Sequence, residues 1–245
     1  MRFPYLLLLG LTCAQAFSAP VIQKTDRAEL NWTTMKIRFY GEGQLSKQTF
    51  AVSEKGAIQD GLNYIFKELP AIRKENFKIA KVDGDHQQAA LELTKRTYPI
   101  QTNVSADGVL TVELESSLVT ALKPLVEHNQ QVEDSSEAGP KHTGIVIKIK
   151  GDFIPKPVYK LVDEEGDLLY SHKDVSEAAF EKNLMGRYVK GYSKHEIRSI
   201  LGRETLEIDA SVDSDGNLKV NNAVWDEVLR ADASLVRDAK ILLVL

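Results

Sequence analysis

The sequence is poor in cysteine and tryptophan and has no excess of basic charge. It contains one cysteine and two tryptophans among 245 residues. Its 31 lysines and arginines are outnumbered by 35 aspartates and glutamates, which gives a formal net charge of -4. Proteins dedicated to nucleic-acid binding usually carry a basic face, so this balance argues against a nucleic-acid partner. With a single cysteine no disulfide can form within the chain, and the fold must be stabilised by its apolar core.

The sequence also lacks the common motifs of catalysis and cofactor binding. There is no His-Glu-x-x-His zinc motif, no Gly-x-Ser-x-Gly nucleophile elbow and no Walker lysine. Gly41-Glu42-Gly43 lacks the third glycine of a dinucleotide-binding turn, so we interpret it as a tight turn that ends a strand. Five histidines are scattered without the spacing of metal ligands: His86, His128, His142, His172 and His195. We therefore expect no catalytic residues, no cofactor and no histidine-based metal site.

The first 16 residues have the pattern of a secretory signal peptide. Arg2 supplies the positive start, residues 6–11 form a short apolar run, and Ala14-Gln15-Ala16 matches the small-x-small cleavage motif. We expect cleavage after Ala16, with Ala19 as the alternative. The run is too short to anchor the chain in a bilayer, which takes about 20 apolar residues, and no later segment approaches that length. The sequence thus predicts export and no transmembrane segment.

Cys13 lies at the end of the apolar run, where a bacterial lipid anchor would be attached. A lipobox has a large aliphatic residue three positions before the cysteine and Gly, Ala or Ser directly before it. Gly10 and Thr12 occupy those positions here, which disfavours a lipid anchor at Cys13 but leaves lipidation open. If cleavage follows Ala16, the mature chain has no cysteine, and a thiol nucleophile is excluded.

A polar, acidic segment at residues 128–141 divides the chain into two halves. Its only large apolar residue is Val132, so it cannot bury surface and is expected to be a linker. The elements expected in the first half, residues 17–127, are a strand at 30–40, a helix at 51–69 stopped by Pro70, a strand at 76–82, a helix at 85–94, a hairpin of 99–104 and 109–114 around Ala106-Asp107-Gly108, and a helix at 117–126.

The second half, residues 142–245, shows a similar mixture of strand and helix patterns. Its expected elements are a strand at 143–150, a hairpin of 157–162 and 167–170, helices at 176–185 and 193–202, strands at 205–212 and 218–220, a helix at 222–235 and a closing strand at 240–245. Ser193 and Glu196 have the spacing of a capping box. We predict the α+β class, with two small α/β-sandwich halves whose sheets are mostly antiparallel and are packed against helices.

Two acidic turns offer oxygen atoms to a cation. Asp213 and Asp215, followed by Gly216, resemble the start of a calcium loop, because carboxylates in such a pattern can converge on a hard cation. The segment lacks the third carboxylate and the closing glutamate of that loop, so a hairpin turn is the first interpretation. Residues 163–167 form a second acidic turn. A periplasmic calcium-binding or small-ligand module is therefore the alternative function.

The export signal and a series of short motifs together resemble a known family. In residues 29–127 the motifs are Asn31-Trp32, Tyr40-Gly-Glu-Gly43, Ala51 and Ala57-Ile-Gln-Asp-Gly-Leu62. These resemble the Lpp-twenty surface-lipoprotein family, which includes the flagellar basal-disc protein FlgP and is similar to the N-terminal domain of FlgT. Motifs similar to a C-terminal extension of longer relatives are Thr143-Gly-Ile-Val-Ile147, Pro155-Lys-Pro157, residues 163–170 and residues 238–245. The resemblance implies a non-enzymatic protein that is an envelope antigen or a self-associating part around the flagellar motor.

The sequence as a whole predicts an exported, non-catalytic envelope protein, periplasmic or peripheral at the outer membrane. We expect a structural or adaptor component that associates with itself or with other envelope proteins, those of the flagellar motor in particular. Exposed edges of small antiparallel sheets would make the contact, because their unpaired N–H and C=O groups can pair with another chain. The residues predicted for this interface are Arg38, Tyr40, Tyr159 and Tyr170.

Overall fold

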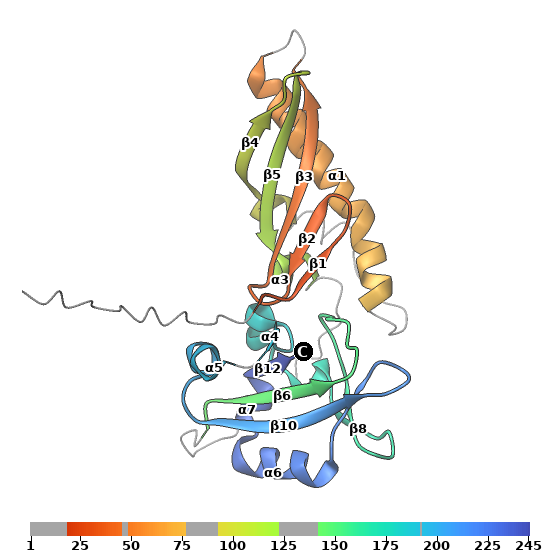
Figure 1. Cartoon of the computed structure of the whole chain (residues 1–245), viewed down its shortest axis with the longest axis vertical. Helices are drawn as coiled ribbons and strands as arrows, with labels where there is room; N and C mark the ends of the chain where they lie inside the picture. The colour runs from red at the N-terminus through yellow and green to blue at the C-terminus, as the bar shows by residue number, and fades with distance from the viewer. Residues whose placement is uncertain (1–18, 46–48, 77–92, 123–141, 192) are drawn as a thin grey trace, which may run out of the picture.

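The computed structural model describes residues 19–45, 49–76, 93–122, 142–191 and 193–245. They form two β-sheets with packed helices, which is the α+β class that the sequence predicts. Figure 1 shows one sheet with a long helix in its upper part and the second sheet with several shorter helices below. The signal peptide, the linker and nearly all of the elements expected at 76–82 and 85–94 lie outside the described residues.

The first sheet consists of five antiparallel strands in the order β1-β2-β3-β5-β4. The expected hairpin around Gly108 is confirmed, with Gly108 at φ +80°, which suits glycine. The single strand expected at 30–40 is instead two strands, because the Asn31 side chain accepts hydrogen bonds from the Thr33 and Thr34 amides and closes a turn. The elements are β1 (Ile22–Lys24), β2 (Ala28–Asn31), β3 (Lys36–Gln44), α1 (Phe50–Asn76), β4 (Tyr98–Val104), β5 (Val109–Ser117) and α3 (Leu118–Leu122).

Glycines let helix α1 approach the first sheet closely. Gly41 lies inside β3 and faces α1, so the prediction that Gly41-Glu42-Gly43 ends the strand is wrong. A Cβ atom on Gly41 would lie 1.8 Å from the carbonyl oxygen of Ala57, which leaves no room for a side chain. Helix α1 also runs past Pro70, where the sequence predicts its end. A proline removes one hydrogen bond from the helical ladder, and here that loss does not end the helix.

The second sheet has seven strands in the order β8-β7-β11-β10-β6-β12-β9. Most of its expected elements are confirmed, and the closing strand is fully buried. Helix α5 begins after Ser193 as expected, but the Ser193 side chain makes no capping hydrogen bond. The elements are β6 (Gly144–Lys150), β7 (Leu161–Val162), β8 (Leu168–Tyr170), η2 (His172–Asp174), α4 (Glu177–Asn183), β9 (Arg187–Val189), α5 (Lys194–Leu201), β10 (Thr205–Val212), β11 (Leu218–Lys219), α6 (Asn222–Asp232), α7 (Ser234–Arg237) and β12 (Ile241–Val244).

Strand direction in the second sheet differs from the sequence prediction. We expected mostly antiparallel pairing, but β6 pairs in parallel with both β10 and β12, β12 with β9, and β11 with β7. Among the described strands of this sheet, the pairs of β10 with β11 and of β7 with β8 are antiparallel. Parallel neighbours need long crossover connections, and helices α4 to α7 supply them here. Period-two patterns show that a strand exists without showing which strand lies beside it.

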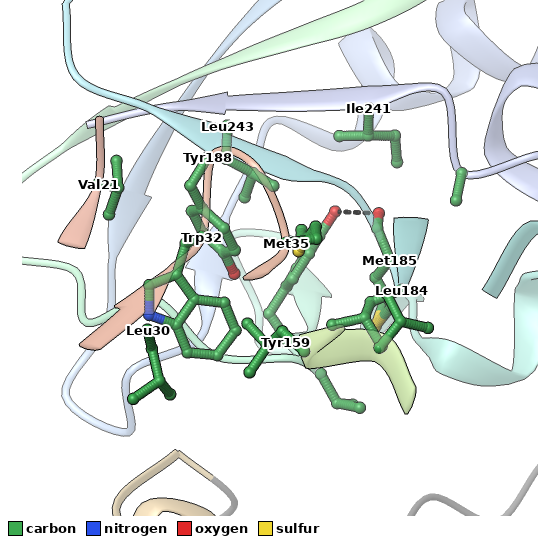
Figure 2. Packing of buried hydrophobic residues seen from close by; sticks show 14 of the residues in the cluster. Val21, Leu30, Trp32, Met35, Tyr159, Leu184, Met185, Tyr188, Ile241 and Leu243 are labelled. Carbon is green, nitrogen blue, oxygen red and sulfur yellow. Dashed lines mark hydrogen bonds between the residues drawn. The ribbon is translucent and has the colours of Figure 1, made fainter. Parts of the chain in front are cut away.

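One apolar core connects the two sheets. The turn between β2 and β3 inserts Trp32 and Met35 among residues of the second half (Figure 2). The rings of Trp32 and Tyr188 meet edge to face at 5.9 Å, and the Thr33 hydroxyl donates a hydrogen bond of 2.6 Å to the Tyr188 carbonyl oxygen. The Lys190 amide also donates to the carbonyl oxygen of Ala19. The described part of the chain contains no helix that is long and apolar enough to cross a membrane.

Candidate functional site

The first sheet has one face covered by a helix and one face open to solvent. Along β3, Ile37 and Phe39 are buried beneath α1, whereas Lys36, Arg38 and Tyr40 point to the opposite side and are exposed. Figure 1 shows α1 on one side of this sheet only. We call the open side the outer face. The strand register adds these residues to it: Glu29 and Asn31 of β2, Glu113 and Glu115 of β5, and Tyr98 of β4.

Glu115 is a buried carboxylate on the outer face. Only 3% of the residue is exposed, and its oxygens accept three hydrogen bonds. The donors are Lys36 Nζ at 2.7 Å, Arg38 Nε at 2.8 Å and the Tyr98 hydroxyl at 2.7 Å. Burial alone would raise the pKa of Glu115, but the three donors outweigh it and lower the pKa to about 2. Glu115 therefore stays charged at neutral pH and joins β3, β5 and β4.

A polar hollow of about 190 Å³ lies beside this cluster. Glu29, Asn31, Thr34, Lys36 and Arg38 line it. Both cations of the lining already pair with Glu115, and Glu29 pairs with Lys24 at 3.2 Å. The charges in this hollow compensate one another, so it is better suited to contact with a polar surface than to capture of a small ion.

Strand β4 forms an edge of the first sheet. It is last in the strand order, and no described strand pairs with its outer side. Three of its large apolar side chains are strongly exposed: Tyr98 at 50%, Ile100 at 40% and Val104 at 50%. The register shifts between Pro99 and Gln101 and is regular from there to the end of the strand. An edge strand with free backbone groups and exposed apolar side chains is a template for pairing with another chain.

Two of the four residues predicted for the interface lie on the outer face. Arg38 is half-exposed and is held by Glu115, with its second contact to Glu113 at 3.9 Å. Tyr40 is 38% exposed on the same strand, and within the described residues its ring and hydroxyl form no ring contact or hydrogen bond. Their neighbours Glu115 and Tyr98 bring these residues and the β4 edge into one continuous surface.

Tyr159 and Tyr170, the other two predicted residues, are core residues. They are 1% and 0% exposed, so neither can contact a partner in the folded protein, and this part of the prediction is corrected. The Tyr159 hydroxyl donates a hydrogen bond of 3.0 Å to the carbonyl oxygen of Met185 (Figure 2), and the Tyr170 ring packs against Tyr159 and Trp225. The strands here are only two or three residues long, too short for alternation to show which side faces the core.

In both acidic turns the first carboxylate accepts hydrogen bonds from backbone amides of the same turn. Asp213 Oδ1 accepts hydrogen bonds of 2.8 Å from the amides of Asp215 and Asn217, and its Oδ2 accepts one from the Asn217 side chain. Asp163 accepts from the amides of Glu165 and Asp167 in the same way. No group of three or more metal-ligating side chains gathers within the described ranges. The hairpin-turn interpretation therefore accounts for both segments.

The sequence prediction missed the residues that organise the outer face. Glu115 and Tyr98 were not singled out, nor was the exposed side chain of Ile100. One signal was available, because Lys36 and Arg38 alternate with apolar residues on one strand while Glu113 and Glu115 do so on another. When every second residue of one strand is basic and every second residue of another is acidic, the opposite charges favour pairing of the two strands.

Comparison of this chain with models of known protein families and with curated proteins finds no match. The functional argument therefore rests on the geometry of the outer face and the β4 edge, together with the sequence itself.

Proposed function

We propose that this chain is an exported, non-catalytic envelope protein that serves as a structural or adaptor component of a periplasmic or outer-membrane assembly. The observation that carries the proposal is the β4 edge. This strand is seven residues long, no described strand pairs with its outer side, and Tyr98, Ile100 and Val104 on it are exposed. Such an edge extends a sheet into a neighbouring chain: backbone hydrogen bonds supply affinity, and alternate side chains supply specificity.

The outer face enlarges this contact surface. Arg38 and Tyr40 of β3 lie on the same face as Tyr98 of the edge strand, and hydrogen bonds to Glu115 hold the Arg38 and Tyr98 side chains in place. Because the Arg38–Glu115 ion pair and the Tyr98–Glu115 hydrogen bond form before a partner arrives, docking orders few additional side chains. Pre-organisation of this kind lowers the entropic cost of association.

Membership of the Lpp-twenty family, and with it a place near the flagellar motor, is part of this proposal. Two of the motifs that carry the resemblance meet in space, since Gly41 of Tyr40-Gly-Glu-Gly43 packs against Ala57 and Gly61 of the helical motif. This contact supports the resemblance because the motifs serve one packing arrangement. Export to the envelope rests on residues 1–16, which lie outside the described residues.

Three of the four ionisable groups with strongly shifted pKa values form hydrogen bonds within the fold, which supports a non-catalytic role; the fourth, Tyr170, is buried with no hydrogen-bond partner among the described residues. Burial raises the pKa of Tyr159 and of Tyr188, and each hydroxyl donates to a backbone carbonyl oxygen in the core. The Glu115 carboxylate accepts hydrogen bonds from three donors on the outer face. These groups stabilise the fold, and none is arranged as a base beside a nucleophile.

Self-association through β4 is tested by light scattering on residues 17–245 over a concentration series. We expect the molar mass to rise with concentration, and the variant Ile100→Lys to remain monomeric, because a charged side chain on an edge strand blocks pairing. Ile154→Lys is the matched control, since Ile154 is 64% exposed and lies in the loop between β6 and β7, outside the first sheet.

Two results contradict self-association through this edge. One is a wild-type chain that stays monomeric at every concentration. The other is an oligomer that Ile100→Lys and Ile154→Lys leave equally intact, which would place the contact on another surface.

A further inference from the structure

The second half contains a basic hollow that the proposed function does not use. Its volume is about 160 Å³, and it lies between α5 and the start of β10. The lining residues are Lys194, Ile197, Arg198, Arg203, Thr205 and Glu207. Three of these six carry positive charge, although the whole chain has a net charge of -4.

Among the described residues, the three cations of the hollow have no charged partner. Within the described residues, the side chains of Lys194, Arg198 and Arg203 form neither an ion pair nor a hydrogen bond. The one carboxylate of the lining, Glu207, is held by Lys148 Nζ at 2.7 Å. This differs from the hollow on the outer face, where both cations are neutralised.

The fold places these side chains in the hollow. Lys194, Ile197 and Arg198 share one face of α5, and buried Ile197 fixes that face against the sheet by packing in a cluster with Val146 and Leu242. Gly202, at φ +97°, then ends the helix and turns the chain back toward Thr205. The hollow therefore brings three exposed cations together, and a cleft lined by charge of one sign attracts the opposite charge.

We propose that this hollow binds a phosphate group. The guanidinium groups of Arg198 and Arg203 and the Lys194 ammonium can each donate to a different oxygen of a tetrahedral anion. The Thr205 hydroxyl is a further donor. A carboxylate has only two oxygens, which a single arginine can satisfy. The N-terminal end of α5, which the Ser193 side chain does not cap, adds positive potential, and Glu196 in its first turn offsets part of it. The phosphate belongs either to a small soluble molecule or to a lipid headgroup.

Calorimetric titration of residues 17–245 with inorganic phosphate at low ionic strength tests the soluble form. We expect saturable binding that is weakened at least about tenfold in Arg198→Gln/Arg203→Gln, because charge-assisted hydrogen bonds are lost. Both arginines are exposed, so the variant should fold, and circular dichroism checks this. Arg230→Gln/Lys182→Gln is the matched control, since it removes two exposed cations that do not line the hollow.

Sedimentation with vesicles tests the lipid form. The vesicles contain equal parts of phosphatidylcholine and phosphatidic acid, whose headgroup is a phosphate monoester, and pure phosphatidylcholine is the reference. Binding to the mixed vesicles that is lost in Arg198→Gln/Arg203→Gln, without binding of free phosphate, supports the site and identifies a lipid source. Two results overturn the proposal: neither probe binds, or the control pair weakens binding as much as the double arginine variant does.

Discussion

At the residue scale, the outer face depends on one carboxylate that is buried among its partners. Glu115 takes one hydrogen bond from each of two strand-β3 cations and from Tyr98 of the edge strand. A buried charge is tolerated only when it is paired and hydrogen-bonded. The cluster therefore couples the stability of the sheet to the position of the edge that we propose for docking.

Removing the charge of Glu115 should destabilise the protein in a pH-dependent way. The folded pKa of about 2 lies below the ordinary value of 4.5, so the charge stabilises the fold above about pH 4.5 and this contribution is lost as the pH falls toward 2. We expect Glu115→Gln to lower the free energy of unfolding by up to about 3 kcal/mol at pH 7 and by progressively less below pH 4.5. Chemical denaturation between pH 3 and pH 7 measures this difference.

Glu113→Gln is the control for that experiment. Glu113 lies on the same face of β5, but its single ion pair among the described residues, with Arg38, is long at 3.9 Å. A weak, partly solvated pair of this kind contributes less than about 1 kcal/mol. Equal effects of the two substitutions, or a Glu115→Gln effect that is constant with pH, would contradict the role assigned to Glu115.

The two buried tyrosines should respond differently to loss of the hydroxyl. Tyr159→Phe leaves the buried Met185 carbonyl oxygen without its donor and should cost about 1–2 kcal/mol. The Tyr170 hydroxyl has no hydrogen-bond partner among the described residues, so Tyr170→Phe should be neutral or stabilising. Thermal denaturation of the two variants measures the contrast, and a reversed order would contradict this assignment of the hydrogen bonds.

At the scale of elements, helix α1 and strand β3 pack through backbone surfaces. Gly41→Ala should destabilise the protein by about 3 kcal/mol or more, because the added methyl group meets the backbone of Ala57. Gly56→Ala is the matched control: nothing lies within 4 Å of its added Cβ, and alanine should stabilise α1 by about 0.5–1 kcal/mol. Urea denaturation compares the two, and a mild Gly41→Ala effect would show that the helix can move away from the sheet.

The acidic turn after β10 should behave as a turn and not as a calcium site. Asp213→Ala removes the acceptor of two amides and should cost about 1–2 kcal/mol, whereas Asp215→Ala, with an exposed carboxylate, should change stability by less than about 0.5 kcal/mol. We expect millimolar calcium to leave Tm unchanged in all three proteins. A calcium-dependent rise in Tm that both substitutions abolish would instead support the ligand-binding alternative.

At the scale of the whole molecule, the two sheets share one apolar core, and we expect them to unfold together. Trp32 of the first half packs edge to face on Tyr188 of the second, and the turn that carries Trp32 also binds the Tyr188 backbone through Thr33. Because the sheets share an apolar cluster, loss of packing at this junction should destabilise both of them.

Trp32→Ala tests this cooperativity. Truncation of the fully buried side chain should lower the free energy of unfolding by about 3–5 kcal/mol. Native-state hydrogen exchange should show faster opening of amides in both β3 and β6. Trp225→Ala, equally buried but within the second half, is the comparison. If Trp32→Ala accelerates exchange in β3 alone, the two halves unfold independently.

The sequence by itself determined those features that depend on neighbouring residues. The alternation along 35–39, the strand pattern at 143–150 and the turn at Ala106-Asp107-Gly108 predict strands and a hairpin that the structure contains. These are local choices, because side-chain period and backbone freedom at a turn act over a few residues. The α+β class followed from the order of such segments.

Only the tertiary structure decided which segments meet. It made β6, β10 and β12 parallel neighbours, buried Tyr159 and Tyr170, and placed Gly41 against the backbone of α1. The Glu115 cluster forms between residues 79 positions apart. Contacts of that kind depend on how whole elements pack, and the free energy of packing depends on shape and burial that no short window of sequence contains.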